Sequence, residues 1–214
     1  MANDLETMRR RLGDKLHDTD DEVWSAGEKD ELLTWAVRRL NQRLLRPLDP
    51  ESSTQQITLV SEDYFYAIDA GITHISRVDL LDSDGDDFGE VEGWEVVGDM
   101  VGGTAKLHVS KRIVDAGGTL RIVGYGRYTL PTEESSQASA IPDDYVLLVL
   151  NTATAEAYNR MLSDRVKFRQ WQNTNQTQNV SINELIQMAN QAERQRDDEW
   201  LTFRTWQKPV PGRI

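Results

Sequence analysis

The spacing of apolar residues changes twice along this chain, and these changes constrain the fold more than any short motif does. Over the first 46 residues apolar side chains recur every three or four positions, which is the period of an amphipathic helix. Between residues 56 and 125 they alternate in short runs separated by turn residues, as in antiparallel strands. After residue 142 the helical period returns. The sequence therefore predicts an α+β fold, with a small antiparallel β domain inserted into a helical bundle.

The N-terminal part predicts two helices. The first helix carries one apolar stripe, made of Leu5, Met8, Leu12 and Leu16. The second helix begins after Ser25, an N-cap residue whose capping-box partner three positions later is Glu28. We expect this helix to run to about Arg46, because Pro47 cannot continue it.

The middle of the chain predicts five or six antiparallel strands that form a small sheet or sandwich. The alternating runs cover residues 56–60, 64–68, 74–81, 94–97, 105–109 and 119–125. The segments between them, such as DAG and GDMVGG, have the composition of tight turns. After the last run, SSQASA reads as a polar linker.

The C-terminal part predicts two further helices and a tail. A long helix over about 143–172 follows Pro142, and its apolar first half makes it the expected central element of the bundle. A second capping box, from Ser181 to Glu184, begins the last helix. This helix is charged on all sides over residues 193–199, so we expect it to leave the body of the protein there. The expected domains are 1–54 (helical pair), 55–131 (β domain), 132–199 (central and C-terminal helices) and 200–214 (aromatic tail).

The net charge of −12 is concentrated in the middle of the chain, where residues 47–142 carry 6 basic and 17 acidic side chains. Such a segment repels phosphate backbones, which disfavours tight nucleic-acid binding. The chain has no cysteine, which excludes disulfides and thiolate zinc sites. Without a long apolar run or a secretory start, we expect a soluble, intracellularly made protein that contacts no membrane.

Residues 82–90, DSDGDDFGE, resemble the start of a calcium loop. The oxygen-ligand positions are occupied by Asp82, Asp84, Asp86 and Glu90. However, Asp87 stands where a helix–loop–helix calcium site needs glycine, and Gly93 stands where it needs a bidentate glutamate. The flanking residues also have strand periodicity. We therefore interpret this segment as an acidic β-turn and predict no metal site, with a calcium-dependent binding module as an alternative.

The sequence offers no convergent set of catalytic groups. His17, His74 and His108 each lack a partner at metal-ligand spacing, and no nucleophile elbow, P-loop or dinucleotide fingerprint is present. The adjacent Asp143 and Asp144 fall in a predicted first helical turn, where negative charge favours the helix dipole. We therefore predict a protein that is not an enzyme and needs no cofactor.

The C-terminal tail has aromatic side chains without an obvious core of their own. They lie beyond the charged stretch and comprise Trp200, Phe203 and Trp206, followed by Val210. Exposed aromatic clusters usually mark interfaces, so we interpret the tail as a partner-binding surface. The alternative is that it folds back onto its own bundle.

Three segments in this order resemble the adaptor proteins of the head-to-tail connector in tailed bacteriophages. The first is the helix start Trp24-Ser25-x-x-Glu28, the second is GTLRIVGYGRYTLP with its final strand leading to Tyr125, and the third is AIPDDYVLLVLNTATAEAYNRM. The resemblance covers about residues 3–172.

The resemblance implies a virion structural protein, made in the host cytoplasm and located in the neck between capsid and tail. Such proteins form a ring, commonly twelve-fold, beneath the portal, and they join it to a stopper, nozzle or other tail protein. Double-stranded DNA passes through the ring without specific binding. The resemblance also implies a C-terminal grip on the portal, which makes the end at Ile214 a portal-contact candidate along with the aromatic tail residues. The acidic residues 82–90 become a candidate channel-facing loop, and a stopper or tail-completion protein of the same connector is the alternative function.

Overall fold

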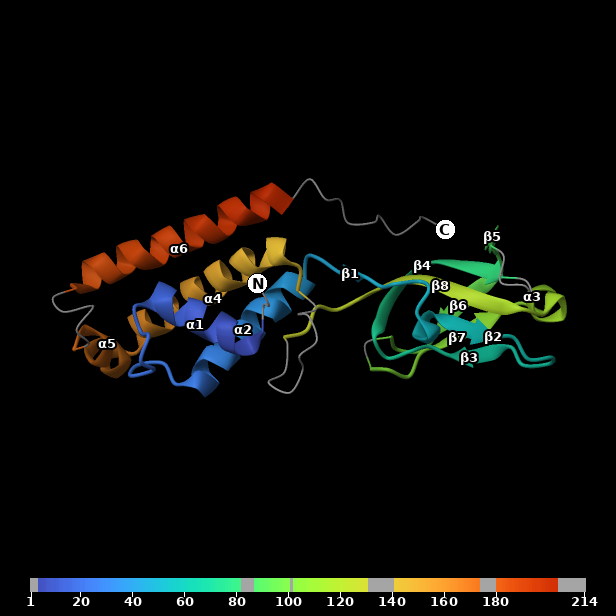
Figure 1. Ribbon diagram of the computed structural model, residues 1–214, viewed down its shortest axis with the longest axis horizontal. Helices are drawn as coiled ribbons and strands as arrows, with labels where there is room; N and C mark the ends of the chain where they lie inside the picture. Colours follow the sequence, from blue (N-terminus) through green and yellow to red (C-terminus); the bar gives the residue numbers. More distant parts are fainter. Residues whose placement is uncertain (1–3, 82–86, 101, 131–140, 174–179, 204–214) are drawn as a thin grey trace. The chain divides into compact units, whose positions relative to one another are not determined.

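A computed structural model describes residues 4–81, 87–100, 102–130, 141–173 and 180–203 (Figure 1). The described residues form two compact units. The first, called the helical unit here, comes from the described residues within 4–44 and 128–203, and the second, the β unit, from those within 45–127. The chain therefore leaves the helical unit once and returns to it, and the predicted α+β fold with an inserted antiparallel β domain is confirmed.

The helical unit begins with the two helices that the sequence predicts. Helix α1 (Leu5–Leu16) is capped by Asp4, and three residues of its predicted stripe, Met8, Leu12 and Leu16, are buried. Helix α2 (Ala26–Asn41) has the predicted capping box, with both reciprocal hydrogen bonds in place. It ends earlier than expected, because the backbone turns after Asn41 and then enters strand β1 (Arg46–Pro47) of the β unit.

The central helix is shorter than predicted. Helix α4 (Asp143–Ser163) ends before Asp164, and a separate helix, α5 (Arg165–Gln172), follows it. The Asp164 carboxylate accepts hydrogen bonds from the backbone N–H groups of Val166 and Lys167, so it caps a new helix instead of continuing the old one. The expectation of one helix to about residue 172 is therefore wrong beyond Ser163.

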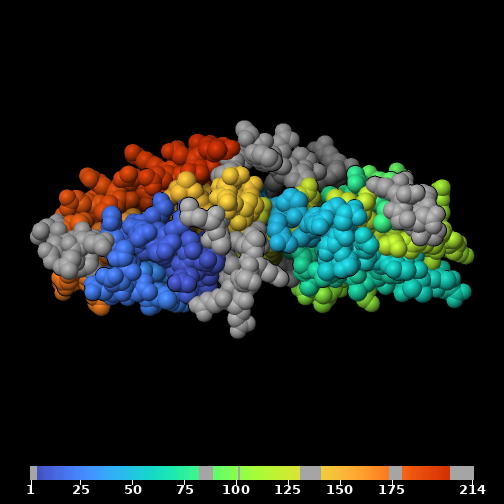
Figure 2. Space-filling model, viewed as in Figure 1, coloured from blue at the N-terminus to red at the C-terminus, as the bar shows by residue number. Residues whose placement is uncertain are grey.

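Helix α6 (Ile182–Phe203) begins at the predicted second capping box, where Glu184 and Ser181 exchange hydrogen bonds. It packs along α4, and the Asn159 amide donates to the Glu193 carboxylate between the two helices. The space-filling view shows α6 along one flank of the helical unit (Figure 2).

Helix α4 is the core of the helical unit, as its apolar first half predicts. Twelve of its residues are buried, among them Leu148, Leu150 and Ala153. Residues from α1, α2, α5 and α6 pack around it, including the fully buried Trp171. Because α4 is enclosed by the other helices, it needs no polar face of its own.

The β unit contains two antiparallel sheets. The first is ordered β1-β8-β4-β5 with β2 also pairing β8, and the second is ordered β3-β7-β6. Their strands are β2 (Gln56–Thr58), β3 (Phe65–Ala67), β4 (Ile72–Leu81), β5 (Asp87–Glu90), β6 (Trp94–Val97), β7 (Lys106–Val109) and β8 (Thr119–Gly126). All six predicted strands are confirmed, and residues from both sheets contribute to one shared core.

Besides the 3-10 turn η1 (Ser53–Gln55), three short elements of the β unit were not predicted. Strand β1 has only two residues, and it forms because Arg46 and Pro47 lie beside β8. Strand β5 forms within the acidic segment by pairing with β4. Helix α3 (Lys111–Ala116) lies in the connection between β7 and β8. Each is too short for a periodic pattern, so tertiary pairing determines it.

Candidate functional site

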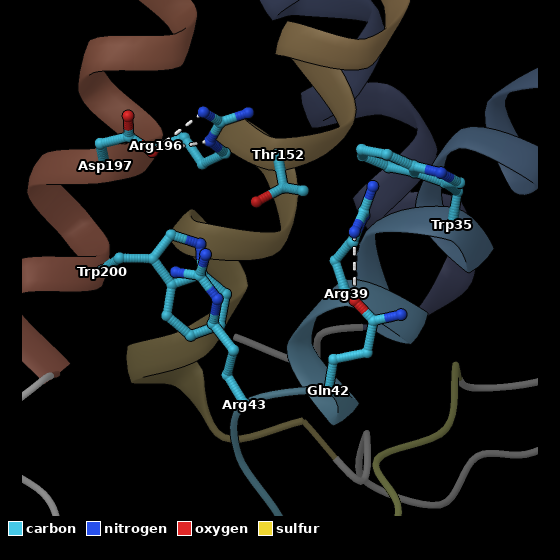
Figure 3. Close-up of a pocket in the computed structure, with 8 residues that line it drawn as sticks. All are labelled: Trp35, Arg39, Gln42, Arg43, Thr152, Arg196, Asp197 and Trp200. Atoms are coloured by element: carbon cyan, nitrogen blue, oxygen red, sulfur yellow. Dashed lines mark hydrogen bonds and ion pairs between the residues drawn. The ribbon is translucent and has the colours of Figure 1, made fainter.

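A pocket of about 230 Å³ opens between helices α2, α4 and α6 of the helical unit (Figure 3). We call it the arginine pocket. It is lined by Trp35, Arg39, Gln42, Arg43, Thr152, Arg196, Asp197 and Trp200. Among the described residues it combines three guanidinium groups and two indole rings with one carboxylate, and arginine and aromatic residues are enriched at protein interfaces.

Helical spacing places these side chains together. Trp35 and Arg39 are four residues apart in α2, and Arg43 follows after another four positions, just beyond the helix end. On the opposite wall, Arg196 and Trp200 are also four residues apart in α6. Because α6 runs antiparallel to α4, its last turns lie against the end of α2, and the two sets of side chains face each other across Thr152 (Figure 3).

Each tryptophan carries an arginine over its ring. The Arg39 guanidinium lies 5.1 Å from the centre of the Trp35 ring, and the Arg43 guanidinium lies 4.6 Å from that of Trp200. Both distances are in the range of cation–π attraction. A cation–π contact uses no N–H donor, so the N–H groups that Arg39 and Arg43 do not use elsewhere are available for other partners.

The charges in the arginine pocket are unbalanced. Arg196 is 2.9 Å from the Asp197 carboxylate, which is the only acidic group among the described residues of the lining. Arg39 donates to the Gln42 side-chain oxygen at 3.2 Å, which is a neutral acceptor. Within the part of the chain that the structure describes, neither Arg39 nor Arg43 has a carboxylate within 4.0 Å. The pocket is therefore suited to bind an anionic group.

Trp200 is the one predicted partner-binding residue whose side chain the structure describes, and it does not stand free of the bundle. It is half-buried and packs against the core of the helical unit as well as against Arg43. The expectation that α6 leaves the body over residues 193–199 is therefore wrong. Phe203 ends α6, but its side chain is not described, and Trp206, Val210 and Ile214 lie outside the described residues.

The acidic segment is only partly described. Asp82, Asp84 and Asp86 lie outside the described residues, while Asp87 begins β5 and the exposed Glu90 ends it. The segment follows β4, and its last four residues form β5, which pairs with β4 and was not predicted. Among the described side chains, no three of His, Asp or Glu come together as a metal-binding group.

The motif Trp24-Ser25-x-x-Glu28 has a tertiary partner that sequence reasoning missed. Lys167 of α5 places its ammonium group 3.8 Å from the centre of the Trp24 ring, and it forms an ion pair with Glu28. Partial burial raises the pKa of the Glu28 carboxyl, but Lys167 and the Ser25 hydrogen bonds outweigh it and hold that pKa below its ordinary value. The motif therefore joins the start of α2 to α5.

A buried ionic cluster, also missed, holds the connection between α1 and α2. The Lys29 side chain is 2% exposed, and its ammonium group donates to the Asp18 backbone oxygen at 2.7 Å and pairs with the Asp21 carboxylate. The Asp18 carboxylate accepts from the backbone N–H groups of Val23 and Trp24. Every charge in this cluster has a partner within the chain, which indicates a structural role.

The β unit contains a similar structural cluster. The Asp79 side chain is 0% exposed and lies between two arginines, with Arg77 at 2.8 Å and Arg121 at 3.0 Å. Arg121 also pairs with Glu51 at 2.9 Å. The cluster links β4 to β8 across the register in which Asp79 faces Arg121. Like the Lys29 cluster, it leaves no charge for a ligand.

Comparison with known proteins assigns the chain to a family. A family model described as "SU10 adaptor protein" matches residues 3–208, which is nearly the whole chain. No curated protein sequence gives a significant match. None of the helices that the structure describes is both long and apolar enough to cross a membrane.

Proposed function

We propose that this chain, which belongs to the SU10 adaptor protein family, forms a ring beneath the portal and joins the portal to the next tail component. Membership of this family makes it a structural adaptor protein of a bacteriophage, located in the virion neck. The finer proposal is a ring of twelve copies around the channel through which double-stranded DNA passes. The family match over residues 3–208 carries this proposal, because it includes both units and all the described helices.

The two units suit different parts of this work. A subunit of a closed ring needs two different side surfaces, because each copy contacts the next in a head-to-tail manner. The helical unit provides a rigid body around α4, and the β unit is an insertion that carries most of the negative charge. We therefore assign assembly contacts to the helical unit first.

We assign the portal contact to the chain beyond α6. The candidates are Phe203, Trp206, Val210 and Ile214. Trp200 is better understood as the anchor of this segment, because it is half-buried in the helical unit and stacked on Arg43. Next to it, Leu201 is 56% exposed and is available to a partner.

The experiment that tests this proposal is native mass spectrometry of the full chain mixed with its cognate portal oligomer. We expect one copy bound per portal subunit. A chain that ends at Phe203 should lose binding, and a control chain in which residues 204–214 are replaced by a Gly/Ser segment of equal length should lose it too. Ending the chain at Phe203 keeps Trp200 and the arginine pocket intact.

Two results would count against the proposal. If the full chain does not bind the portal but binds a tail protein, it is a stopper or tail-completion protein instead. If the Gly/Ser control binds as well as the full chain, the grip on the portal lies elsewhere.

The acidic segment is proposed to line the channel, where repulsion lets DNA slide past without sticking. Reversing the charges of Asp84, Asp86 and Asp87 to lysine should slow DNA ejection from assembled virions. The matched control reverses three exposed carboxylates of the helical unit, Glu6, Glu22 and Glu31. Equal ejection rates in the two variants would show that the acidic segment does not line the channel.

A further inference from the structure

We propose that the arginine pocket is where neighbouring copies of this chain contact each other, and that it binds an acidic side chain from the β unit of the next copy. This inference rests on the ring proposed above and names the partner of one ring surface. Four properties of the pocket and of the chain carry it: the charge imbalance, the N–H donors of the arginines, the volume of the pocket and the charge of the β unit.

The charge imbalance calls for an external carboxylate. Asp197 is paired with Arg196, so Arg39 and Arg43 are the two cations left without an acidic partner among the described residues. By contrast, the buried Lys29 and the largely buried Arg121 each pair with two carboxylates. Arginines are weakly hydrated and form strong hydrogen bonds with carboxylates, so these two gain most from an incoming acid.

The donors of the two arginines favour a planar anion. Each guanidinium carbon lies over an indole ring, a contact that uses no N–H donor, and Arg39 gives one of its five N–H groups to Gln42. A carboxylate can accept two parallel hydrogen bonds from one guanidinium. Thr152, which is 3% exposed, lies between the two walls and supplies a polar group at the base of the pocket (Figure 3).

The volume of the pocket favours a side chain over a free metabolite. At about 230 Å³ it is smaller than the roughly 300–1,000 Å³ that is typical of small-molecule sites. Arginine and tryptophan are also the residues most often found as energetic centres of protein interfaces. Both facts indicate a protein partner that inserts one acidic side chain.

The charge of the chain itself indicates where that side chain comes from. Residues 45–127 carry 7 basic and 15 acidic side chains, a net charge of −8. Glu62, Glu92 and Asp115 are among the exposed carboxylates of this unit. A ring joins two different surfaces of identical copies, so a cationic pocket on the helical unit and an acidic β unit are complementary halves of one contact.

The test is zero-length carbodiimide cross-linking of the full chain assembled on its cognate portal. The variant Arg43→Lys retains a cation over Trp200 and introduces an amine that couples to a contacting carboxylate. Assembling equal amounts of unlabelled and ¹⁵N-labelled copies distinguishes links between copies from links within one copy. The matched control is Arg38→Lys, an exposed arginine of α2 that does not line the pocket.

We expect a mixed heavy–light peptide that joins position 43 to an acidic residue within 45–127, at a yield at least about tenfold above the Arg38→Lys control. A link only within one copy, a link to the portal, or a yield no higher than the control would each overturn the inference. In all three cases the copies are on the portal, so the proposed function stands. If no copies bind the portal, the proposed function fails, and this inference fails with it.

A second variant gives an independent readout. The double change Arg39→Glu with Arg43→Glu should still bind the portal through the tail, but neighbouring copies should repel each other at the pocket. We expect partial occupancy of the portal at concentrations where the wild-type chain fills it, with a roughly tenfold or larger loss in half-saturating concentration. The control Arg38→Glu should fill the portal normally. Full occupancy by the double variant at wild-type concentration would also overturn the inference.

Discussion

The two ends of helix α2 use cations in opposite ways. In the first turns, Lys29 is buried and paired with Asp18 and Asp21. Around the last turn, Arg39 and Arg43 are exposed and lie over tryptophan rings, with no carboxylate nearby among the described residues. The first arrangement satisfies every charge inside the chain, whereas the second leaves charge for a partner.

The helix dipole explains part of this difference. A cation near a helix N-terminus is unfavourable, so Lys29 depends on two nearby carboxylates. A cation near the C-terminus is favourable by itself, so Arg39 and Arg43 need no partner for the helix to be stable. Side chains with the same positive charge therefore stabilise the fold at one end of α2 (Lys29) and are available to bind a partner at the other (Arg39 and Arg43).

Replacing Lys29 should have the largest effect on stability. Lys29→Met keeps much of the side-chain volume but leaves the buried Asp18 carboxylate without its cation, which costs about 3–5 kcal/mol of unfolding free energy. Arg43→Met at the exposed end should change it by about 0.5 kcal/mol or less. Urea unfolding of both variants measures the difference. Equal stabilities would show that the buried cluster and the pocket are energetically alike.

Replacing the glycines on either side of the connection between α1 and α2 should have the next largest effect on stability. In α1, a Cβ on Gly13 would lie 2.9 Å from the Asp18 backbone oxygen and 3.0 Å from the Lys29 ammonium. Gly13→Ala should therefore destabilise the protein by about 1–3 kcal/mol, despite the better helix propensity of alanine. A Cβ on Gly27 in α2 would meet nothing within 4 Å, so Gly27→Ala should stabilise it by up to about 1 kcal/mol.

Thermal unfolding of these two variants should move the melting temperature in opposite directions. A melting temperature that rises in Gly13→Ala would mean that the connection between α1 and α2 can move aside. The close approach around Lys29 would then not be required for the fold.

Substitutions in the two capping boxes should have the smallest effect on stability. Glu28 pairs with Lys167 in addition to Ser25, whereas Glu184 is exposed and bonds Ser181. The pKa of Glu28 is held below its ordinary value, so its ionised form stabilises the fold above the unfolded pKa of about 4.3. That contribution is lost as the pH falls through the folded pKa.

Glu28→Gln should therefore lower stability by up to about 1 kcal/mol at pH 7, and the difference from wild type should vanish near pH 3. Glu184→Gln, which lacks the partner on another helix, should change stability less at pH 7. Urea unfolding at the two pH values checks both statements. A Glu28→Gln effect that persists at pH 3 would show that shape, not charge, matters at this site.

Helix starts and strand positions were predictable, because their signals are local. The capping boxes at Ser25 and Ser181 involve residues three positions apart, and alternation within four to eight residues is enough to indicate a strand. Helix ends were less predictable. At Asp164 the backbone hydrogen bonds of α4 end, and the Asp164 side chain caps the new helix α5. The apolar pattern of the same residues fits one continuous helix equally well.

The arginine pocket could not have been predicted from the residues that line it. Arg43 and Trp200 are far apart in the sequence, and they meet only because α6 packs antiparallel on α4. The sequence signalled Trp200 as an unusual aromatic residue near the tail, but the same composition fits an exposed partner surface and a residue packed on its own bundle. The sequence predicted residues 200–214 as one tail, whereas the structure places Trp200 in the helical unit.

The sequence by itself determined the α+β fold, the position of the six main strands, the helix starts and the family resemblance, because all of these depend on local patterns and their order. Only the tertiary structure decided which charges are paired. Lys29, Arg39 and Arg43 lie on one short segment, and their roles follow from the groups that the fold brings near them. These groups are Asp18 and Asp21 of the α1–α2 connection, Trp35 of α2 and Trp200 of α6. Electrostatic pairing depends on distance in space, which no local pattern in the chain specifies.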